Sequence, residues 1–254
     1  MSRVSLVVPV YNEAGLIESS AATIRTFLEG RGGEFEVVFS DDGSTDGTTD
    51  VLRRLEKDDA TRRTRLVVAE QNQGKGGALN LGLAAATGDV VAYIDADMEI
   101  PISHVGDVLQ GIAEGYDLCV GSKAIGDSQR ESRRKIAHKV YNGMVRNLLG
   151  SRVYDHSCGV KAFRREVVDA VLHEMRDKKW VWDTEFLVRA QRKGFRVKEV
   201  PIHSVSRRES KVRFVSAVID SFGAVLRLYF QGVKVPRNLR KDATTPARRA
   251  NATG

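Results

Sequence analysis

Short apolar runs alternate with longer segments of helical pattern over the first 95 residues, and this alternation restricts the fold more than any other feature of the chain. Each run is rich in β-branched or aromatic residues, which is typical of strands buried in a sheet. The order strand, helix, strand with short loops predicts a parallel, doubly wound α/β sheet. The predicted strands are 4–10, 35–39, 65–69 and 90–94, and the predicted helices between them are 14–29, 49–57 and a segment ending at Ala86.

The later residues continue the α/β pattern less regularly. Helices are predicted at 103–114, at 165–175 and from about Asp183 to Lys193, and short strands at 116–121, within 155–163 and at 196–200. Asp183 is a candidate N-cap for the third of these helices.

Two carboxylates, Asp95 and Asp97, follow the predicted strand 90–94 directly. Ligands of open α/β sheets bind outside the carboxyl ends of the strands. Carboxylate oxygens at that edge suit Mg²⁺ or Mn²⁺ carrying a diphosphate. The alternative is a strand-to-loop junction with two solvated acids, and the Asp-Ala-Asp pattern alone does not decide between these interpretations.

The glycines disfavour two familiar nucleotide-binding folds. No G-x-G-x-x-G follows the first predicted strand, so a dinucleotide fingerprint is missing. The segment 74–77 (Gly-Lys-Gly-Gly) lacks the first glycine and the final Ser or Thr of a phosphate loop, which disfavours kinase or ATPase chemistry. Lys75 beside a helix N-terminus could bind an anion, or it could be a surface lysine on a tight turn.

Composition restricts the class of partner. A chain of 254 residues with 42% hydrophobic residues can bury one α/β core, or one core with a small annex. The net charge of +7 indicates an anionic partner, which could be nucleic acid, a membrane surface or a phosphorylated substrate. Cys119 and Cys158 have no metal-ligand spacing, so we expect a reduced cytoplasmic setting. Because residues 1–10 pass directly into a predicted strand and no apolar run approaches ~20 residues, we expect neither a secretory signal nor a membrane-spanning helix.

The most basic stretch is predicted to be helical. Arg130, Arg134 and His138 recur at helical spacing and would share one face. This face is either solvated or a phosphate clamp, for which arginine forks are suited. A nucleic-acid-binding module would interleave aromatic residues with the charges, but 130–139 contains none, so that class is disfavoured.

The segment 212–230 repeats apolar residues every three to four positions. Such a helix either docks on the domain or lies in a membrane interface. The basic residues that follow show no apolar period, and we expect 233–254 to be disordered.

Seven motifs follow one another along the chain: PVYNEAG, DDGSTDGT, NQGKGGALNLG, DADMEIP, CGVKAFRRE, WDTEF and EVPI…ESK. Together they resemble the motifs of inverting GT-A glycosyltransferases of family 2, and within that family those of the dolichyl-phosphate mannose and dolichyl-phosphate glucose synthases. The resemblance covers about residues 4–211 and implies a GT-A fold: a mostly parallel sheet flanked by helices, here followed by a C-terminal amphipathic helix.

The resemblance implies a sugar-nucleotide site with a divalent metal. Asp41 would read the base, Lys75 would lie near the base or the phosphates, and Lys211 would close over the donor. Asp97 and Glu99 would hold Mg²⁺ or Mn²⁺. The residues implied in donor binding are Pro9, Tyr11, Glu13, Asp41, Lys75, Asp95, Ala96 and Lys211.

Four positions depart from the family pattern. Glu99 replaces the Gln of most mannose synthases, which adds a negative charge at the metal. Lys123 replaces an arginine and would weaken a bidentate phosphate contact. His138 replaces a hydroxyl residue one turn after the acceptor-phosphate arginine, Arg134. Glu209 replaces a glycine, so the loop that closes over the donor would be stiffer.

Two acceptor chemistries remain open. A phosphate monoester is already anionic near neutrality, with a second pKa of ~6, and needs no general base. It needs a cationic cradle, for which the candidates are Lys123, Arg130, Arg133 and Arg134. A sugar hydroxyl would instead need a carboxylate base, for which Asp183 and Glu185 are the candidates.

The favoured interpretation is transfer of glucose or mannose from UDP-glucose or GDP-mannose to dolichyl or polyprenyl phosphate, with Asp97, Arg134 and Asp183 as catalytic candidates. The alternative is a family 2 enzyme that glycosylates a sugar hydroxyl in a surface polysaccharide. A catalytically inactive scaffold is disfavoured because Lys75, Asp95 and Asp97 are retained.

The expected organisation is a catalytic domain at 1–211, an amphipathic interfacial helix at 212–232 and a basic tail at 233–254. We expect peripheral attachment to the cytoplasmic face of a membrane. The hexose, the lipid length and the oligomeric state stay open.

Overall fold

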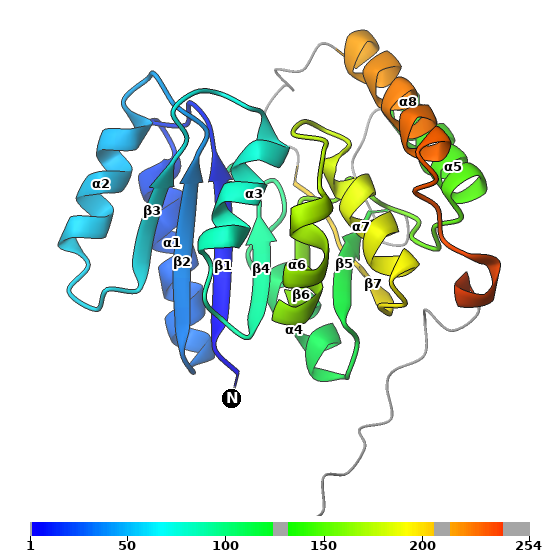
Figure 1. The fold of residues 1–254 in the computed structure, drawn as a ribbon. Coiled ribbons are helices and arrows are strands. Elements are labelled where there is room, and N and C mark those ends of the chain that lie inside the picture. Colours follow the sequence, from blue (N-terminus) through cyan, green and yellow to red (C-terminus); the bar gives the residue numbers. More distant parts are fainter. Residues whose placement is uncertain (1, 124–131, 206–213, 241–254) are drawn as a thin grey trace, which may run out of the picture.

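A single sheet organises the protein in the computed structural model, which describes residues 2–123, 132–205 and 214–240, without the side chains of 132–137, 214–220, 237 and 240. The strand order is β3-β2-β1-β4-β6-β5-β7 (Figure 1). The strands are β1 (Val4–Val10), β2 (Phe35–Asp41), β3 (Thr64–Val68), β4 (Val90–Ile94), β5 (Leu118–Ser122), β6 (Val160–Arg164) and β7 (Val197–Pro201).

Helices cover both faces of this sheet. Figure 1 shows α1 and α4 on one face and α3, α6 and α7 on the other, with α5 and α8 beside α7. The helices are α1 (Ile17–Arg31), α2 (Thr48–Asp58), α3 (Lys75–Ala85), α4 (Ser103–Ala113), α5 (Ser132–Leu149), α6 (Arg165–Val171), α7 (Trp182–Arg192) and α8 (Phe214–Phe230).

Six of the seven strands run in one direction. β1 pairs in parallel with β2 and β4, β2 with β3, and β5 with β7. β6 is antiparallel to both of its neighbours, β4 and β5. The predicted α/β class and mostly parallel sheet are therefore confirmed, and the start of β6 lies at the edge where β4 and β5 end.

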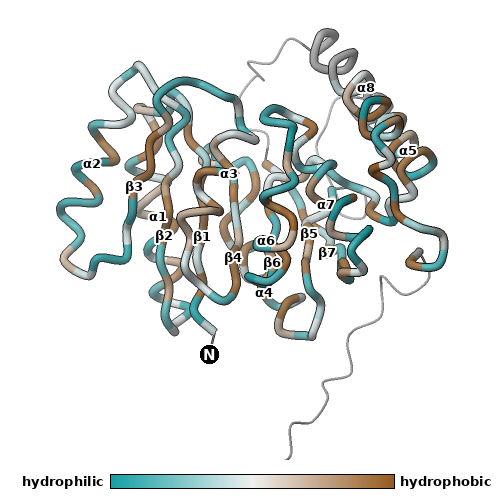
Figure 2. The backbone as a smooth tube through the Cα atoms, viewed as in Figure 1, coloured by the Kyte–Doolittle hydropathy of each residue, from teal (hydrophilic) through white to brown (hydrophobic). Residues whose placement is uncertain are grey.

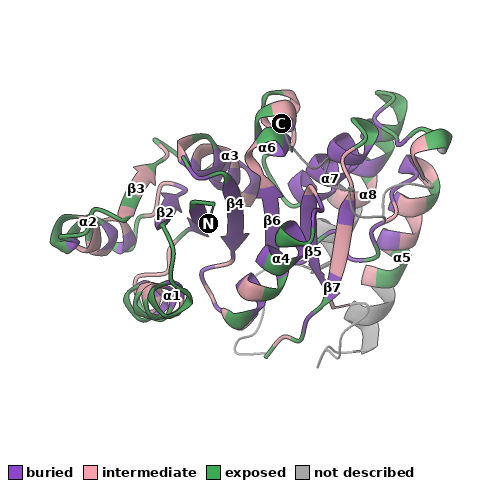
Figure 3. Cartoon of the chain, turned by 90° about the horizontal axis from the view of Figure 1, so that it is seen from below, coloured by how far each residue is buried: buried purple, intermediate pink, exposed green. Residues whose placement is uncertain are grey.

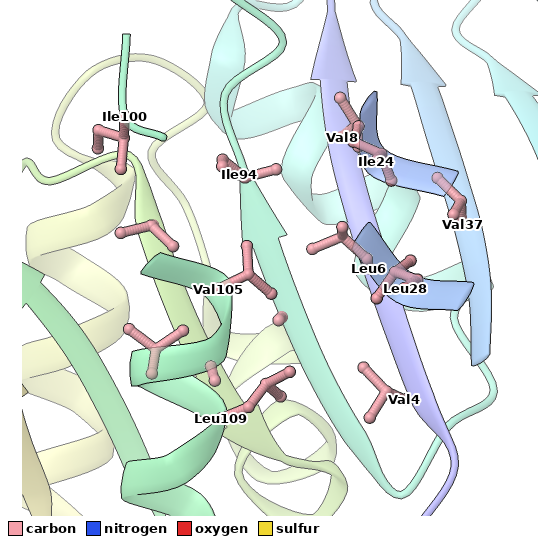
Figure 4. Packing of buried hydrophobic residues seen from close by; sticks show 14 of the residues in the cluster. Val4, Leu6, Val8, Ile24, Leu28, Val37, Ile94, Ile100, Val105 and Leu109 are labelled. Atoms are coloured by element: carbon pink, nitrogen blue, oxygen red, sulfur yellow. The ribbon is translucent and has the colours of Figure 1, made fainter. Parts of the chain in front are cut away.

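The alternation of side chains along β1 builds two cores. Leu6 and Val8 are fully buried in the cluster that includes Ile24 of α1 and Val105 of α4 (Figure 4). Val7 points to the opposite face and packs with α3, α6 and α7. Because both faces are covered, the strand reads as a continuous apolar run rather than an alternating one. Figure 2 shows the result as brown strands behind helices of mixed hydropathy.

α8 docks on α5 and α7 along one of its sides. Ala224, Val225 and Leu228 are buried in a third cluster with residues of both helices. The neighbouring side chain of Phe230 is 81% exposed, and Leu226 and Tyr229 are also exposed. The helix thus docks on the domain and leaves an apolar surface uncovered. None of the described helices is long and apolar enough to cross a bilayer.

The C-terminal boundary differs from the sequence prediction. The sequence prediction places Val233 and Val235 in a disordered tail, but both are buried against the same cluster. The backbone N–H of Val235 donates to the carbonyl of Leu149, which ties this segment to the end of α5. Two valines inside a basic stretch form too short an apolar pattern to be recognised in the sequence. Residues 241–254 lie outside the described part of the chain.

Candidate active site

The carboxyl ends of β1, β2, β4 and β5 lie at one edge of the sheet, and this edge carries most of the predicted site residues. Val10, the last residue of β1, is paired with Asp41, the last residue of β2. Asp95 follows β4, which is the other neighbour of β1. Parallel strands therefore bring loops that are distant in the sequence together at the edge where α/β sheets bind ligands.

Hydrogen bonds join the loops after β1 and β2. The backbone N–H of Asn12 donates to Ser44 Oγ (2.9 Å), and Asn12 Oδ1 accepts from the N–H of Thr45 (2.8 Å). The backbone N–H of Glu13 donates to Thr48 Oγ1 (2.9 Å). Tyr11 stands on this joined surface with 43% of its surface exposed. The two loops therefore form one unit, which carries the predicted donor residues Tyr11 and Glu13.

Asp41 is fully buried, and its carboxylate is engaged by its own loop. Oδ1 accepts from the backbone N–H (3.0 Å) and the hydroxyl (2.6 Å) of Ser44, and Oδ2 accepts from the hydroxyl of Thr49. These bonds shape the turn between β2 and α2. Reading of the base by Asp41 stays a prediction.

Lys75 and Asp95 form an ion pair at the end of β4. The Nζ of Lys75 lies 2.6 Å from Asp95 Oδ1, and the Lys75 side chain is only 18% exposed. Burial by itself would lower the pKa of Lys75, but the carboxylates of Asp95 and Asp183 outweigh it and raise this pKa. Lys75 is thus a charged group directed at the acidic strand end.

The glycines around Lys75 allow close packing and do not form a phosphate loop. A Cβ on Gly76 would lie 2.7 Å from the Lys178 carbonyl carbon and 2.7 Å from Trp182 Cβ. The N–H of Gly77 donates to the carbonyl oxygen of Lys178, and Asp42 accepts the N–H of Gly74. The amide before α3 and one amide in its first turn therefore have protein partners, which agrees with the absence of a phosphate-loop motif.

Asp97 and Glu99 lie just beyond Asp95, both partly exposed. Asp97 Oδ1 accepts the backbone N–H of Glu99 (3.0 Å), which closes a tight turn through Met98. Within the described residues, no three His, Cys, Asp or Glu side chains form a metal-binding group. Two carboxylates at an open edge still fit Mg²⁺ or Mn²⁺, because such ions keep water and substrate phosphate oxygens among their ligands.

Asp183 belongs to a buried network rather than to a helix cap. α7 begins at Trp182, and no side chain caps it, so the expected N-cap role is wrong. Asp183 Oδ1 accepts from Lys161 Nζ (2.7 Å) and from the hydroxyl of Tyr93. The exposed fractions of the two charged side chains are 1% for Lys161 and 6% for Asp183. Lys161 also donates to Tyr93 Oη (2.7 Å) and to the carbonyl of Cys158 (2.6 Å).

Glu185, the other candidate base, is held inside the fold. Its side chain is fully buried, and Oε1 accepts from Nε (2.9 Å) and Nη2 (2.7 Å) of Arg189 one turn later. Oε2 accepts from the backbone N–H groups of Arg176 and Asp177. This carboxylate therefore orders the loop before α7 and is not directed at the sheet edge.

Two segments that carry predicted acceptor residues follow β5. Lys123 follows β5, and Arg133 and Arg134 belong to the first turn of α5, where the backbone alone is described. Arg130 and Lys211 fall outside the described residues. The structure therefore brings the segments of Lys123 and Arg134 to the edge without fixing the contacts of the arginines.

Four residues that the sequence reasoning did not single out complete the site: Tyr93, Asp155, Gly159 and Lys161. A Cβ on Gly159 would lie 2.0 Å from Asp95 Oδ2, so only glycine lets Asp95 occupy its place. A lysine inside the apolar run Val160–Phe163 was an available signal, because a buried lysine requires a partner. No sequence pattern identified that partner as Asp183.

The GT-A-like sheet with an acidic strand end defines the class of a glycosyltransferase fold. The chain belongs to glycosyl transferase family 2, whose family model matches residues 5–172. The family inferred from the seven motifs is thereby confirmed.

Two curated relatives of this chain are longer proteins. Glycosyltransferase AglD of Haloferax volcanii is 37% identical over 245 residues, which cover 94% of this chain and 39% of that protein. The undecaprenyl-phosphate 4-deoxy-4-formamido-L-arabinose transferase of Pectobacterium carotovorum subsp. carotovorum is 33% identical over 177 residues, covering 68% of this chain and 52% of that protein. The chain thus spans only part of the length of either relative.

Solved structures share the fold at low sequence identity. Glucosyl-3-phosphoglycerate synthase from Mycobacterium tuberculosis, in complex with Mn²⁺, UDP-glucose and phosphoglyceric acid, superposes with a TM-score of 0.69 at 22% identity. The match covers 92% of this chain and 81% of that chain. An identity this low establishes a common fold and no common substrate.

Proposed function

We propose that this chain transfers a hexose, with inversion, from a nucleoside-diphosphate sugar to the phosphate of a polyprenyl or dolichyl lipid. A phosphate oxygen of the lipid would attack the anomeric carbon, the bond from that carbon to the diphosphate would break, and the nucleoside diphosphate would leave. The observation that carries the proposal is the state of Asp183, because the carboxylate best placed to act as a base is already paired with Lys161 and Tyr93.

A general base must accept a proton from the attacking group. Lys161 and Tyr93 both donate to Asp183 Oδ1, so a proton taken up by that oxygen would displace these contacts. Glu185 is bound on both oxygens, to Arg189 and to backbone amides. If the acceptor is already anionic, neither carboxylate is needed as a base. The Pectobacterium relative, whose name specifies undecaprenyl phosphate, supports an acceptor of this kind.

On the donor side, we assign Asp95 and Ala96 to contacts with the sugar nucleotide, with Pro9, Tyr11, Glu13 and Asp41 at the nucleoside. The ion pair with Lys75 would keep Asp95 in one orientation during binding. Lys211 remains assigned to closure over the donor. UDP-glucose and GDP-mannose are the two candidate donors.

Asp97 and Glu99 would hold a divalent ion, Mg²⁺ or Mn²⁺. Such an ion supplies charge neutralisation for the departing diphosphate. The hard oxygen donors and their partial exposure at the strand end favour this assignment.

The acceptor would approach from the side of α5 and α8. The two helices lie side by side (Figures 1 and 3), and α8 exposes Leu226, Tyr229 and Phe230. These side chains lie near the end of α8 that packs with the C-terminal half of α5, and the other end of α5 carries Arg133 and Arg134. An apolar surface on the same helix pair as two arginines suits a lipid whose headgroup is a phosphate. We therefore propose peripheral attachment to the cytoplasmic membrane face through α8.

The direct test begins with thermal-shift measurements of UDP- and GDP-sugars in the presence of Mn²⁺ or Mg²⁺, because a ligand that binds the folded state raises its melting temperature. The stabilising donor is then used in a transfer assay with a short-chain polyprenyl phosphate. We expect Arg134→Ala to reduce transfer by at least about tenfold, the loss typical of one charged hydrogen bond. Arg53→Ala, which removes an exposed arginine of α2, serves as the control. No stabilisation by any donor, or full activity of Arg134→Ala, would reject the proposal.

Transfer to a sugar hydroxyl is the second candidate. The closeness of Asp183 to the site favours it, since Asp183 contributes to the raised pKa of Lys75. If the wild type does not bind liposomes and Asp183→Asn has no activity, this alternative is favoured.

A further inference from the structure

One buried carboxylate joins the two segments that carry the proposed acceptor cations. Asp155 Oδ2 accepts the backbone N–H of Lys123 (2.9 Å) at the end of β5. Asp155 Oδ1 lies 2.9 Å from Nε2 of His138 in α5. The Asp155 side chain is fully buried, whereas the His138 side chain is 18% exposed. Asp155 itself belongs to neither segment, since it lies in the loop before β6.

The direction of the bond to His138 follows from the chemistry of its partners. An ionised carboxylate only accepts, so Nε2 of His138 carries the hydrogen. The side-chain nitrogen of Asn142 lies 3.2 Å from Nδ1 and 3.3 Å from Nε2, and it donates to the backbone carbonyl of His138 (2.9 Å). Ser157 Oγ also lies 3.0 Å from Nε2. The hydrogen on Nε2 is therefore assigned from the Asp155 carboxylate.

The loop that carries Asp155 is fixed to the sheet. The backbone N–H groups of Tyr154 and Asp155 donate to the two carboxylate oxygens of Glu199 in β7, at 2.9 and 3.0 Å. Glu199 is itself largely enclosed, and burial raises its pKa. The position of Asp155 is thus set by the sheet through Glu199, and the positions of Lys123 and His138 are set by Asp155.

Arg134 precedes His138 by four residues, one helical turn, and shares its face of α5. A bond that fixes His138 against Asp155 therefore also fixes the rotation of the turn that carries Arg134. A support that holds the backbones of Lys123 and Arg134 in place before the acceptor binds reduces the ordering cost that the acceptor must overcome.

We propose that Asp155 is a positioning residue for the acceptor phosphate. Through its two oxygens it holds the end of β5 and the first half of α5 at the spacing at which Lys123 and Arg134 can bind one phosphate. This inference rests on the proposed function, because it concerns the same acceptor. Asp155 acts through these residues and touches no substrate itself.

The test compares the KM values of the two substrates in Asp155→Asn. An amide oxygen can accept one of the two hydrogen bonds, but the amide nitrogen would face a second donor. We expect the KM for a short-chain polyprenyl phosphate to rise about tenfold, the effect of roughly one lost charged hydrogen bond. The KM for the sugar nucleotide should stay within about twofold of the wild-type value, since that site lies on β1, β2 and β4. Equal rises in both KM values, or an unchanged acceptor KM, would overturn the inference.

His138 gives a second pair of variants that does not remove the buried charge. His138→Leu deletes the donor to Asp155, and we expect it to raise the acceptor KM as Asp155→Asn does. His138→Gln keeps an N–H near the same place and should recover most of the acceptor affinity. If Asp155→Asn does not fold, these two variants test the inference in its place. Equal acceptor KM values for His138→Leu and His138→Gln would contradict it.

Asp59→Asn is the matched control. Asp59 is also a buried carboxylate that accepts backbone N–H groups, those of Thr61, Arg63 and Thr64, but it lies before β3 at the opposite edge of the sheet. We expect this variant to lower the melting temperature without changing either KM. If the wild type does not transfer the sugar to polyprenyl phosphate, the proposed function is rejected. If it does, but Asp155→Asn does not raise the acceptor KM more than the donor KM, only the positioning role is rejected.

Discussion

Replacing Lys161 by Met would test the buried network beneath the candidate site. The change keeps an unbranched side chain but removes an ammonium that donates to Asp183, Tyr93 and the carbonyl of Cys158. Breaking a buried ion pair by removing one partner typically costs about 3–5 kcal/mol, because a buried charge is left without compensation. With roughly 2–4 °C per kcal/mol for a domain of this size, we expect the melting temperature to fall by about 6–20 °C.

Thermal and urea unfolding, followed by circular dichroism, would measure this loss. Lys198→Met is the matched control, since Lys198 pairs with Glu114 at the surface with 30% and 39% of the side chains exposed. We expect this control to cost less than about 1 kcal/mol. In Lys161→Met/Asp183→Asn the buried charge is absent, so the double variant should be more stable than Lys161→Met alone. A loss below about 1 kcal/mol in Lys161→Met, or a double variant as unstable as the sum of both single changes, would refute the reasoning.

Three further predictions concern the donor site, the metal and acid stability. In Gly159→Ala the new Cβ would lie 2.0 Å from Asp95 Oδ2 and displace this carboxylate. Calorimetric titration should therefore show the affinity for the sugar nucleotide reduced at least about tenfold. The control Gly30→Ala, whose Cβ would have nothing within 4 Å, should bind the sugar nucleotide as the wild type does. Asp97→Asn should reduce transfer at least about a hundredfold with the melting temperature nearly unchanged, and activity retained at saturating Mn²⁺ would contradict the assignment. Burial lowers the pKa of His156 from 6.5 to about 3, so between these pH values the unfolded chain binds a proton that the folded chain does not. The free energy of unfolding should therefore fall as the pH drops through this window, by at most about 1.4 kcal/mol per pH unit. An equal slope in His156→Gln would show that another group is responsible.

The elements whose periodicity is strong could be predicted from the sequence. The strands 4–10 and 90–94 were placed at their observed bounds, because β-branched residues between tight turns leave few alternatives. The position of Asp95 at the carboxyl end of a central strand followed from the same pattern. The predicted helix 165–175 ends as an α-helix at Val171 and continues as a 3₁₀ turn, a boundary that periodicity cannot resolve.

Partners across the sheet could not be predicted, because they depend on strand order and direction. Asp183 was a candidate cap on local grounds, since it stands near the start of a helix. Its actual partners, Tyr93 and Lys161, are 90 and 22 residues away in the sequence. Asp155 likewise could be identified from the sequence only as an acidic loop residue, because its partners lie near β5, in α5 and in β7.

The reversed strand β6 explains why these residues meet. Its antiparallel register pairs Ile94 with Val160 and Tyr93 with Lys161, so the start of β6 lies against the end of β4. Gly159 therefore falls beside Asp95, and the Lys161 side chain enters the same core as Tyr93 and α7. A parallel β6 would place its carboxyl end there and carry Gly159 and Lys161 to the opposite edge. Without Lys161 the Asp183 carboxylate would lose its cationic partner and keep the hydrogen bond from Tyr93. The proposed choice of an anionic acceptor over a hydroxyl thus depends on the direction of this one strand.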